Sequence, residues 1–118
     1  MLYVAPSGIH GVGVFTSASI AKGSAIRLFA RGDYRFTPRP VGVAQRYCVE
    51  TNRPAGGYWR PRDFHRMSIG YYLNHHDRPN VQACLWRALR RIEPGEELTI
   101  DYARLWPPSR GRPKRKSQ

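Results

Sequence analysis

Short apolar runs separated by glycine and proline are the feature that most limits how this chain can fold. The 118 residues include 11 glycines and 10 prolines, and both residue types interrupt helices and favour turns. Between them lie strand-like runs of four to six residues at Leu2–Ala5, Gly13–Thr16, Ala25–Ala30 and Leu98–Tyr102. The sequence therefore predicts a mostly β fold with little helix.

A hairpin is predicted in the middle of the chain. Arg46–Glu50 and Gly57–Arg60 have strand composition, and the turn-rich segment Thr51–Gly56 lies between them. After this hairpin, Asp63–Leu73 fits a turn or two of helix, with Asp63 as its cap.

Two further segments carry weaker signals. Val81–Ile92 contains neither glycine nor proline and by itself fits a helix, but its strand-rich surroundings leave strands equally open. Residues 31–45 are rich in glycine, proline and arginine and are expected to form an irregular insert.

Length and composition indicate one domain that can fold alone. Hydrophobic residues make up 41% of the chain, enough for a core. No apolar run reaches the roughly eighteen residues of a membrane span, and Met1–Pro6 lacks the layout of a signal peptide. We therefore expect a soluble intracellular protein without membrane contact, in which Cys48 and Cys84 are small buried residues of apolar runs.

The chain is strongly basic, with a net charge of +12. Such a charge favours an acidic partner, most often a nucleic acid, although it also fits a role in solubility alone. From Pro107 onward the basic sequence has no apolar pattern, so residues 107–118 are predicted to be an exposed tail outside the core.

Two motifs near the C-terminus are the most specific features. The first is Tyr72-Leu73-Asn74-His75 followed by Pro79-Asn80, and the second is Gly95-Glu96-Glu97-Leu98-Thr99-Ile100-Asp101-Tyr102. In this order and separation they resemble the signature of SET-domain protein lysine methyltransferases. The glycines of Gly11-Val12-Gly13, placed before an apolar strand, fit the start of such a domain. The resemblance covers about Ser7 to Trp106 and is closest to compact single-domain viral and bacterial members.

The resemblance implies a fold and a cofactor. The fold is the SET-domain fold, made of several small sheets (a β-clip) with a knot-like threading of the C-terminal segment, over residues 1–106. It also favours strands within Val81–Ile92. The implied cofactor is S-adenosylmethionine, and the residues implied to line its site are Gly11, Val12, Gly13, Tyr72, Asn74, His75 and Trp106.

The match departs from the family pattern at two positions. A serine commonly follows the Asn-His pair, and here it is His76; an arginine often precedes the Asn by three residues, and here it is Tyr71. His75-His76-Asp77 also raises the question of a metal site. Adjacent residues rarely point at one ion and no further ligand is suitably spaced, so we predict that no metal is bound.

The family resemblance implies a catalytic role for Tyr102. Methyl transfer to a lysine needs the neutral amine, whose ordinary pKa is about 10.4, so an apolar channel is required to favour it. The tyrosine hydroxyl would orient the amine or stabilise the shifting charge. Aromatic side chains suit such a channel, and Tyr47, Tyr58 and Tyr71 are the candidates to line it.

The tail resembles an AT-hook, a short motif centred on Arg-Gly-Arg-Pro. Here the corresponding residues are Arg110, Gly111, Arg112 and Pro113, followed by Lys114. An extended backbone at the glycine fits a narrow minor groove, in which the arginines meet negative potential. A solvated basic tail or a targeting signal remains the alternative.

The sequence thus supports two hypotheses. The first is a lysine methyltransferase, monomeric or homodimeric, acting on a DNA-associated or histone-like protein, with DNA contact through the tail. The second is a catalytically inactive SET-fold protein that binds DNA as an accessory factor. A location in the cytoplasm or nucleoid is expected in a bacterium, and in the nucleus for a eukaryotic or viral protein.

Overall fold

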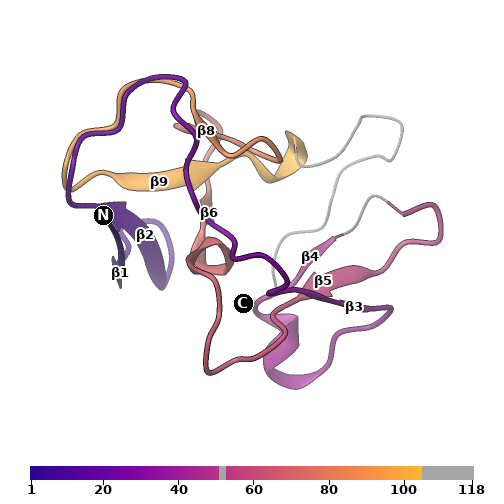
Figure 1. Cartoon of the computed structure of the whole chain (residues 1–118). Helices are drawn as coiled ribbons and strands as arrows, with labels where there is room; N and C mark the ends of the chain where they lie inside the picture. Colours follow the sequence, from indigo (N-terminus) through magenta and orange to yellow (C-terminus); the bar gives the residue numbers. More distant parts are fainter. Residues whose placement is uncertain (51–52, 105–118) are drawn as a thin grey trace.

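The computed structural model describes residues 1–50 and 53–104 of the chain (Figure 1). Short strands dominate this part, and the helical segments are brief 3₁₀ turns, which confirms the predicted mostly β fold. The strands are β1 Leu2–Pro6, β2 Val12–Thr16, β3 Arg35–Thr37, β4 Val49–Glu50, β5 Tyr58–Arg60, β6 Asn74–His75, β7 Val81–Gln82, β8 Arg87–Ala88 and β9 Glu97–Ile100. The 3₁₀ turns are η1 Gly42–Gln45, η2 Ile69–Tyr72 and η3 Tyr102–Arg104.

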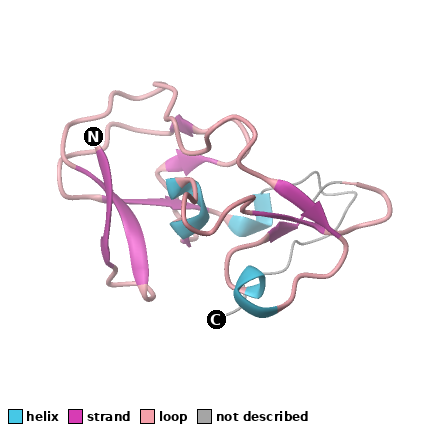
Figure 2. Cartoon of the chain, turned by 60° about the horizontal axis from the view of Figure 1, so that its bottom comes forward, coloured by secondary structure: helices cyan, strands magenta, loops and turns pink. Residues whose placement is uncertain are grey.

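The strands form three small sheets. The largest has the order β1-β2-β9-β6, the second has the order β3-β5-β4, and β7 pairs with β8. Both views place the β3-β5-β4 sheet on the opposite side of the molecule from the β1-β2 hairpin (Figures 1 and 2). The several small sheets expected from the family resemblance are therefore present.

One parallel pairing connects distant parts of the chain. β6 runs alongside β9, with Asn74 opposite Thr99 and His75 opposite Ile100. On its other edge, β9 pairs antiparallel with β2, where Val14 lies opposite Leu98. This arrangement makes β9 a central strand and brings the two C-terminal motifs together.

The main core lies around β9. Val14, Ile92 and Leu98 are fully buried, and Leu73 and Ile100 are nearly so. Burying an aliphatic side chain of this kind contributes about 1.5–3 kcal/mol. Since β9 is covered on both faces, its consecutive residues from Leu98 to Ile100 are all buried, and the alternating pattern of a half-buried strand is absent there.

The structure corrects the prediction of a strand at Ala25–Ala30. Only Ala25 makes an isolated bridge, with Arg87. Ile26 and Leu28 are buried as an apolar run predicts, but their backbones bond separately to Trp86 and to Gly70. With its partners on different segments, this stretch packs into the core without forming a continuous ladder.

Several smaller expectations also change. Residues 31–45 contain β3 and η1, so the insert is less irregular than expected. The last strand ends at Ile100, because Tyr102 begins η3. The helical turn is η2, and its N-cap is Ser68. Asp63 instead accepts a hydrogen bond from the His65 backbone in an earlier turn.

Val81–Ile92 forms strands, as the family resemblance favours, with β7 pairing antiparallel with β8. Two residues of the intervening turn, Cys84 and Trp86, have positive φ values of 72° and 53°. Cys84 is exposed, so its prediction as a buried residue was wrong, whereas Cys48 is buried. The reversal of the chain places Cys84 at a turn facing solvent.

The hairpin predicted around Thr51–Gly56 is present as β4 and β5, with Val49 opposite Trp59. Thr51 and Asn52 themselves lie outside the described residues, as do Trp106 and the basic tail. The predicted domain boundary after residue 106 therefore stays a prediction. No helix within the described ranges has the length and apolar character needed to cross a membrane.

Candidate functional site

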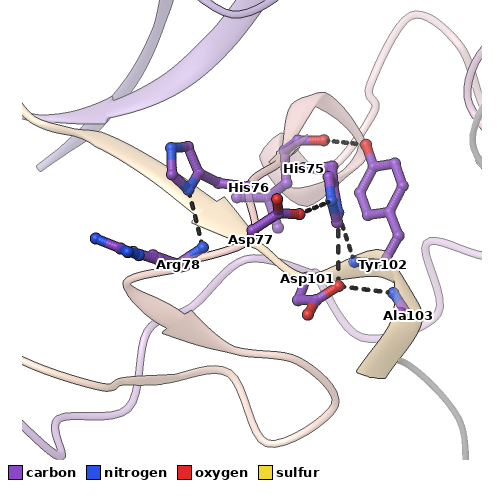
Figure 3. Close-up of polar contacts among 8 residues, drawn as sticks. His75, His76, Asp77, Arg78, Asp101, Tyr102 and Ala103 are labelled. Atoms are coloured by element: carbon purple, nitrogen blue, oxygen red, sulfur yellow. Dashed lines mark hydrogen bonds and ion pairs between the residues drawn. The ribbon is translucent and has the colours of Figure 1, made fainter.

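The β6-β9 pairing brings the Asn-His motif against the residues that follow β9. His75 makes most of this contact through its ring, which lies between Asp77 on one side and Tyr102 on the other (Figure 3). The two ring centroids of His75 and Tyr102 are 5.2 Å apart. The two sequence motifs therefore form one site, as their resemblance to a known signature implied.

Hydrogen bonds fix the orientation and tautomer of His75. Its Nδ1 accepts the backbone N–H of Tyr102 at 3.0 Å, so a neutral ring carries its proton on Nε2. Nε2 lies 3.1 Å from Oδ1 of Asp77, to which it donates. Oδ1 of Asp101 is 3.7 Å from Nδ1. The imidazole thus fixes the backbone at the start of η3, directly at Tyr102.

Tyr102 is one of the buried residues of the hydrophobic core. Its side chain is 8% exposed, and its hydroxyl donates a 2.7 Å hydrogen bond to the carbonyl oxygen of Leu73. Leu73 and Ile100 belong to the same buried cluster. The hydroxyl is thus a precisely held polar group in apolar surroundings, and its catalytic role stays a prediction.

Asn74 holds a different part of the site. Its amide nitrogen is 3.1 Å and 3.0 Å from the carbonyl oxygens of His10 and Val12, and 2.9 Å from Oε2 of Glu97. The side chain is buried. Asn74 therefore fastens the loop that contains Gly11 to β6, and its amide acts within the protein.

Glu97 completes the support of this loop. Its carboxylate accepts the Ser7 hydroxyl at 2.7 Å and 2.9 Å, and Ser7 in turn accepts the backbone N–H of Ile9. Residues 7–13 are thereby tied to β9 at one end and to β6 at the other. A loop held in this way presents its backbone groups in a fixed arrangement.

The two glycines of the loop serve different purposes. A Cβ at Gly13 would lie 2.7 Å from the carboxyl carbon of Glu97, so a larger residue there would displace the carboxylate that bonds to Ser7 and Asn74. Gly11 has a φ of +50°, which favours glycine, and no atom lies within 4 Å of a Cβ built there. The backbone at Gly11 is therefore open to an approaching ligand.

The predicted channel tyrosines lie in different surroundings. The rings of Tyr47 and Tyr72 meet edge to face, with centroids 5.5 Å apart, and burial raises the pKa of Tyr72, with Tyr47 adding to the effect. Tyr58 is half-buried in β5. Tyr71 is 2% exposed, and its hydroxyl donates to the Asp33 carbonyl.

Tyr71 acts as a packing residue in this structure. Its ring meets Phe29 at a centroid distance of 5.1 Å. Burial, followed by the charge of Asp33, raises the pKa of the Tyr71 hydroxyl well above its ordinary value. The roles predicted for Tyr47, Tyr58 and Tyr71 in a channel stay predictions, as does cofactor binding by Trp106, which lies outside the described residues.

Sequence reasoning missed three contributors to this site. They are Ser7, the carbonyl of Leu73 and Glu97 as the anchor of the glycine loop. The Gly-Glu-Glu-Leu motif drew attention to Glu97 but gave no partner for it. Nothing in the sequence marks Ser7 or a backbone carbonyl. Residues 1–50 and 53–104 contain no group of three or more His, Cys, Asp or Glu placed to hold a metal ion.

Comparison with known proteins gives a consistent result. The model of one protein family, described as the SET domain, matches residues 11–103. Among solved structures, a Plasmodium falciparum protein assigned as a candidate histone methyltransferase superposes with a TM-score of 0.61 at 20% identity, covering 90% of this chain and 100% of that one. No significant match was found among curated protein sequences.

Two further solved structures have the same fold. The SET domain of the RIZ1 tumour suppressor superposes with a TM-score of 0.60 at 22% identity, covering 86% of this chain and 68% of that one. The methyltransferase domain of human PR domain-containing protein 2 gives 0.57 at 21% identity, covering 84% and 74%. At these identities the likeness establishes the fold alone.

Proposed function

The chain belongs to the SET-domain family, and from this premise we propose that it is an S-adenosylmethionine-dependent protein lysine N-methyltransferase. The single observation that carries the proposal is that Tyr102 and the loop of residues 10–13 both bond to the consecutive residues Leu73 and Asn74. Leu73 receives the Tyr102 hydroxyl, and the side chain of Asn74 holds the loop that contains Gly11. Two adjacent residues thus connect the loop of residues 10–13, where the cofactor is proposed to bind, with the hydroxyl of Tyr102, the proposed catalytic group.

The residues present fit the proposed cofactor. A nucleoside with a zwitterionic amino-acid end needs both donors and acceptors, and the backbone around Gly11 is unobstructed and rigidly supported. In this proposal the backbone of residues 10–13 and of Asn74-His75 holds the cofactor, and Trp106 would add an aromatic face. When bound, the cofactor supplies an electrophilic methyl group.

Tyr102 is proposed to position the lysine amine. Its proton is donated to the Leu73 carbonyl, so toward another group the oxygen can act only as an acceptor. Accepting an amine N–H there would direct the nitrogen lone pair away from the phenol. His75 keeps the Tyr102 backbone in place through its Nδ1, and such alignment lowers reaction barriers by up to about 7–11 kcal/mol in model systems.

The surroundings of Tyr102 also favour the reactive form of the substrate. A lysine amine is charged at neutral pH, because its ordinary pKa is about 10.4. Apolar neighbours, here Leu73 and Ile100, disfavour the ammonium form by desolvation. The amine would therefore lose its proton more readily on entering this site.

The substrate is proposed to be a DNA-associated or histone-like protein. The support is the net charge of +12, which draws the enzyme to acidic partners such as nucleic acid. A free basic peptide would be repelled by the same charge, so a lysine presented by a DNA-bound protein is the better candidate.

The decisive experiment measures cofactor binding and methyl transfer together. Calorimetry with S-adenosylmethionine should show a saturable site, and labelled methyl groups should pass to a DNA-associated protein of the host. The competing function is an inactive SET-fold protein that binds DNA. An intact, folded chain with no affinity for the cofactor would exclude the methyltransferase.

A further inference from the structure

Outside the C-terminal tail, positive charge is concentrated in residues 31–66, which we call the arginine lobe. The lobe contains eight arginines, no lysine and only three acidic residues, Asp33, Glu50 and Asp63. It includes η1 and the β3-β5-β4 sheet, which lies away from the β1-β2 hairpin (Figures 1 and 2). The lobe is therefore a separate, strongly basic part of the molecule.

Two of the three acidic residues of the lobe, Asp33 and Asp63, hold neighbouring turns through hydrogen bonds. Asp33 accepts the backbone N–H and the hydroxyl of Ser68. Asp63 accepts the backbone N–H of His65 at 2.9 Å. Within the described chain, ion pairs of arginine with an acid join Arg90 to Glu96 and Arg91 to Glu93, outside the lobe.

Two arginines of the lobe occupy opposite positions on neighbouring strands. Arg35 of β3 is directly opposite Arg60 of β5, so both side chains leave the same face of the sheet. Like charges directly opposite each other destabilise a strand pair. Such a pair is stabilised if an anion lies between or above the two guanidinium groups.

Among the described residues, Arg60 has a side-chain donor without a partner. Its Nε is buried and, among the described residues, has no hydrogen-bond partner. Its guanidinium lies 5.0 Å above the ring of Phe64, which holds the group in place without satisfying the donor. A buried donor without a partner is unfavourable, so this guanidinium keeps hydrogen-bonding capacity that the described residues do not use.

The opposite face of the sheet indicates how a nucleic acid would be contacted. There the guanidinium of Arg53 covers the rings of Phe36 and Trp59, at 4.1 Å and 5.2 Å from their centroids. Rings covered in this way do not offer a flat surface on which unpaired bases stack. What this face offers instead is a guanidinium group, which can donate two parallel hydrogen bonds to the oxygens of one phosphate.

We infer that the arginine lobe binds the phosphate backbone of duplex DNA. Duplex DNA is favoured over a single strand because the aromatic face is covered, and the Arg110-Gly111-Arg112-Pro113 run of the same chain has the composition of a minor-groove motif. The lobe is a contact separate from that run. The inference does not rest on methyl transfer and holds for an inactive chain as well.

The test uses the full chain, a fluorescent duplex of about 20 base pairs and anisotropy titrations between 50 and 200 mM salt. One variant combines Arg35→Gln, Arg39→Gln and Arg62→Gln, all exposed residues of the lobe. A matched variant combines Lys22→Gln, Arg27→Gln and Arg78→Gln, which are exposed and outside the lobe. Both lose three positive charges.

The lobe variant should bind at least about tenfold more weakly at 100 mM salt. The slope of log K against log salt should become shallower by roughly 2–3, at about 0.9 per phosphate contact. The matched variant should change the slope by less than about one. Circular dichroism shows whether the triple substitution alters folding. If it does, the Arg35→Gln variant alone should make the slope of log K against log salt shallower by about 0.9.

Three results would overturn the inference. Equal losses in the two variants would show that only total charge matters. Unchanged binding by the lobe variant would assign DNA contact elsewhere. Displacement of the duplex by polyglutamate at the same charge concentration would indicate an acidic protein as the partner. None of these results bears on cofactor affinity, which is measured separately.

Discussion

The hydroxyl of Tyr102 donates a 2.7 Å hydrogen bond to the carbonyl oxygen of Leu73, across 29 residues of sequence. The next residue, Asn74, bonds to the carbonyls of His10 and Val12. Two consecutive residues, Leu73 and Asn74, therefore hold Tyr102 and the loop that contains Gly11 in a fixed relation. The proposed chemistry depends on this junction, and four predictions examine it and its surroundings.

The Tyr102→Phe variant should separate catalysis from binding. It removes the hydroxyl and leaves the Leu73 carbonyl without that donor, so the free energy of unfolding should fall by about 1–3 kcal/mol. Methyl transfer should fall by roughly a hundredfold or more, because loss of one positioned polar group costs about 10²–10³. Cofactor affinity should change little. Denaturant titration, calorimetry and turnover measure the three quantities.

Tyr34→Phe is the control for this prediction, since Tyr34 is 51% exposed. It should leave turnover and stability unchanged within error. Turnover by Tyr102→Phe equal to that of the native chain would remove the catalytic assignment, whatever the effect on stability.

The Asn74→Asp variant should lose cofactor affinity. The substitution places a carboxylate beside two carbonyl oxygens and beside Glu97, in a buried position. Repulsion between these oxygens should release the loop of residues 10–13. Cofactor binding should then weaken at least about tenfold, which corresponds to a loss of about 1.4 kcal/mol in binding free energy. Calorimetry at 25 °C measures the change.

Asn80→Asp is the matched variant for Asn74→Asp. Asn80 is equally buried, and its amide donates to the Glu97 backbone carbonyl at 2.8 Å, away from the glycine loop. It should lose stability while keeping cofactor affinity. Equal loss of affinity in both variants would contradict a specific role of Asn74.

Gly13→Ala should destabilise the protein, whereas Gly8→Ala should not. The new methyl group at position 13 would overlap the Glu97 carboxylate, but nothing lies within 4 Å of the corresponding position at Gly8. Overpacking of this kind costs about 1–3 kcal/mol. Thermal and denaturant unfolding of the two variants test this difference, and equal stability would refute the role assigned to Gly13.

The Arg90–Glu96 pair should contribute to the pH dependence of stability. A hydrogen bond from Arg90, followed by the Glu93 backbone, lowers the pKa of Glu96 from its ordinary value of 4.5. Because the pKa is lower in the folded state, this stabilisation is present above pH 4.5 and is lost as the pH falls through the folded-state pKa. Glu96→Gln should therefore cost less than about 1 kcal/mol at neutral pH.

The measurement is a series of urea titrations of both proteins at falling pH. The difference between native and Glu96→Gln chains should narrow below pH 4.5, the ordinary pKa of this residue. Glu93→Gln also removes one negative charge but leaves the Arg90–Glu96 contact; it breaks the Arg91–Glu93 pair instead, so the two variants compare one exposed ion pair with another at equal net charge. A difference that stayed constant into acid would exclude the pair as its source.

Local pattern was enough to predict much of the fold. β1, β2 and the β4-β5 hairpin appear where apolar runs and turn residues indicated them. The strand predicted at Ala25–Ala30 was wrong, because an apolar run indicates burial but not which backbone groups will pair. The predicted burial of Cys84 was wrong for a related reason: the residue lies in the turn between β7 and β8, where it is exposed to solvent.

The sequence predicted that the two motifs would meet, but not which partners their residues would bond to. The two motifs identified Asn74, His75 and Tyr102, and the structure brings all three together. The sequence did not indicate that Asn74 would act on the protein's own loop, or that Ser7 would bond to Glu97. Such contacts join residues 64 and 90 positions apart, beyond the range of any local pattern.

The sequence by itself determined the β character, the excess of positive charge and the family signature, because each depends only on residue type and short-range spacing. Only the tertiary structure decided that β6 lies parallel to β9 and that Tyr102 meets Leu73. It also placed Arg35 opposite Arg60. These relations follow from strand pairing between distant segments, whose partners are selected by packing of the whole core and not by either segment alone.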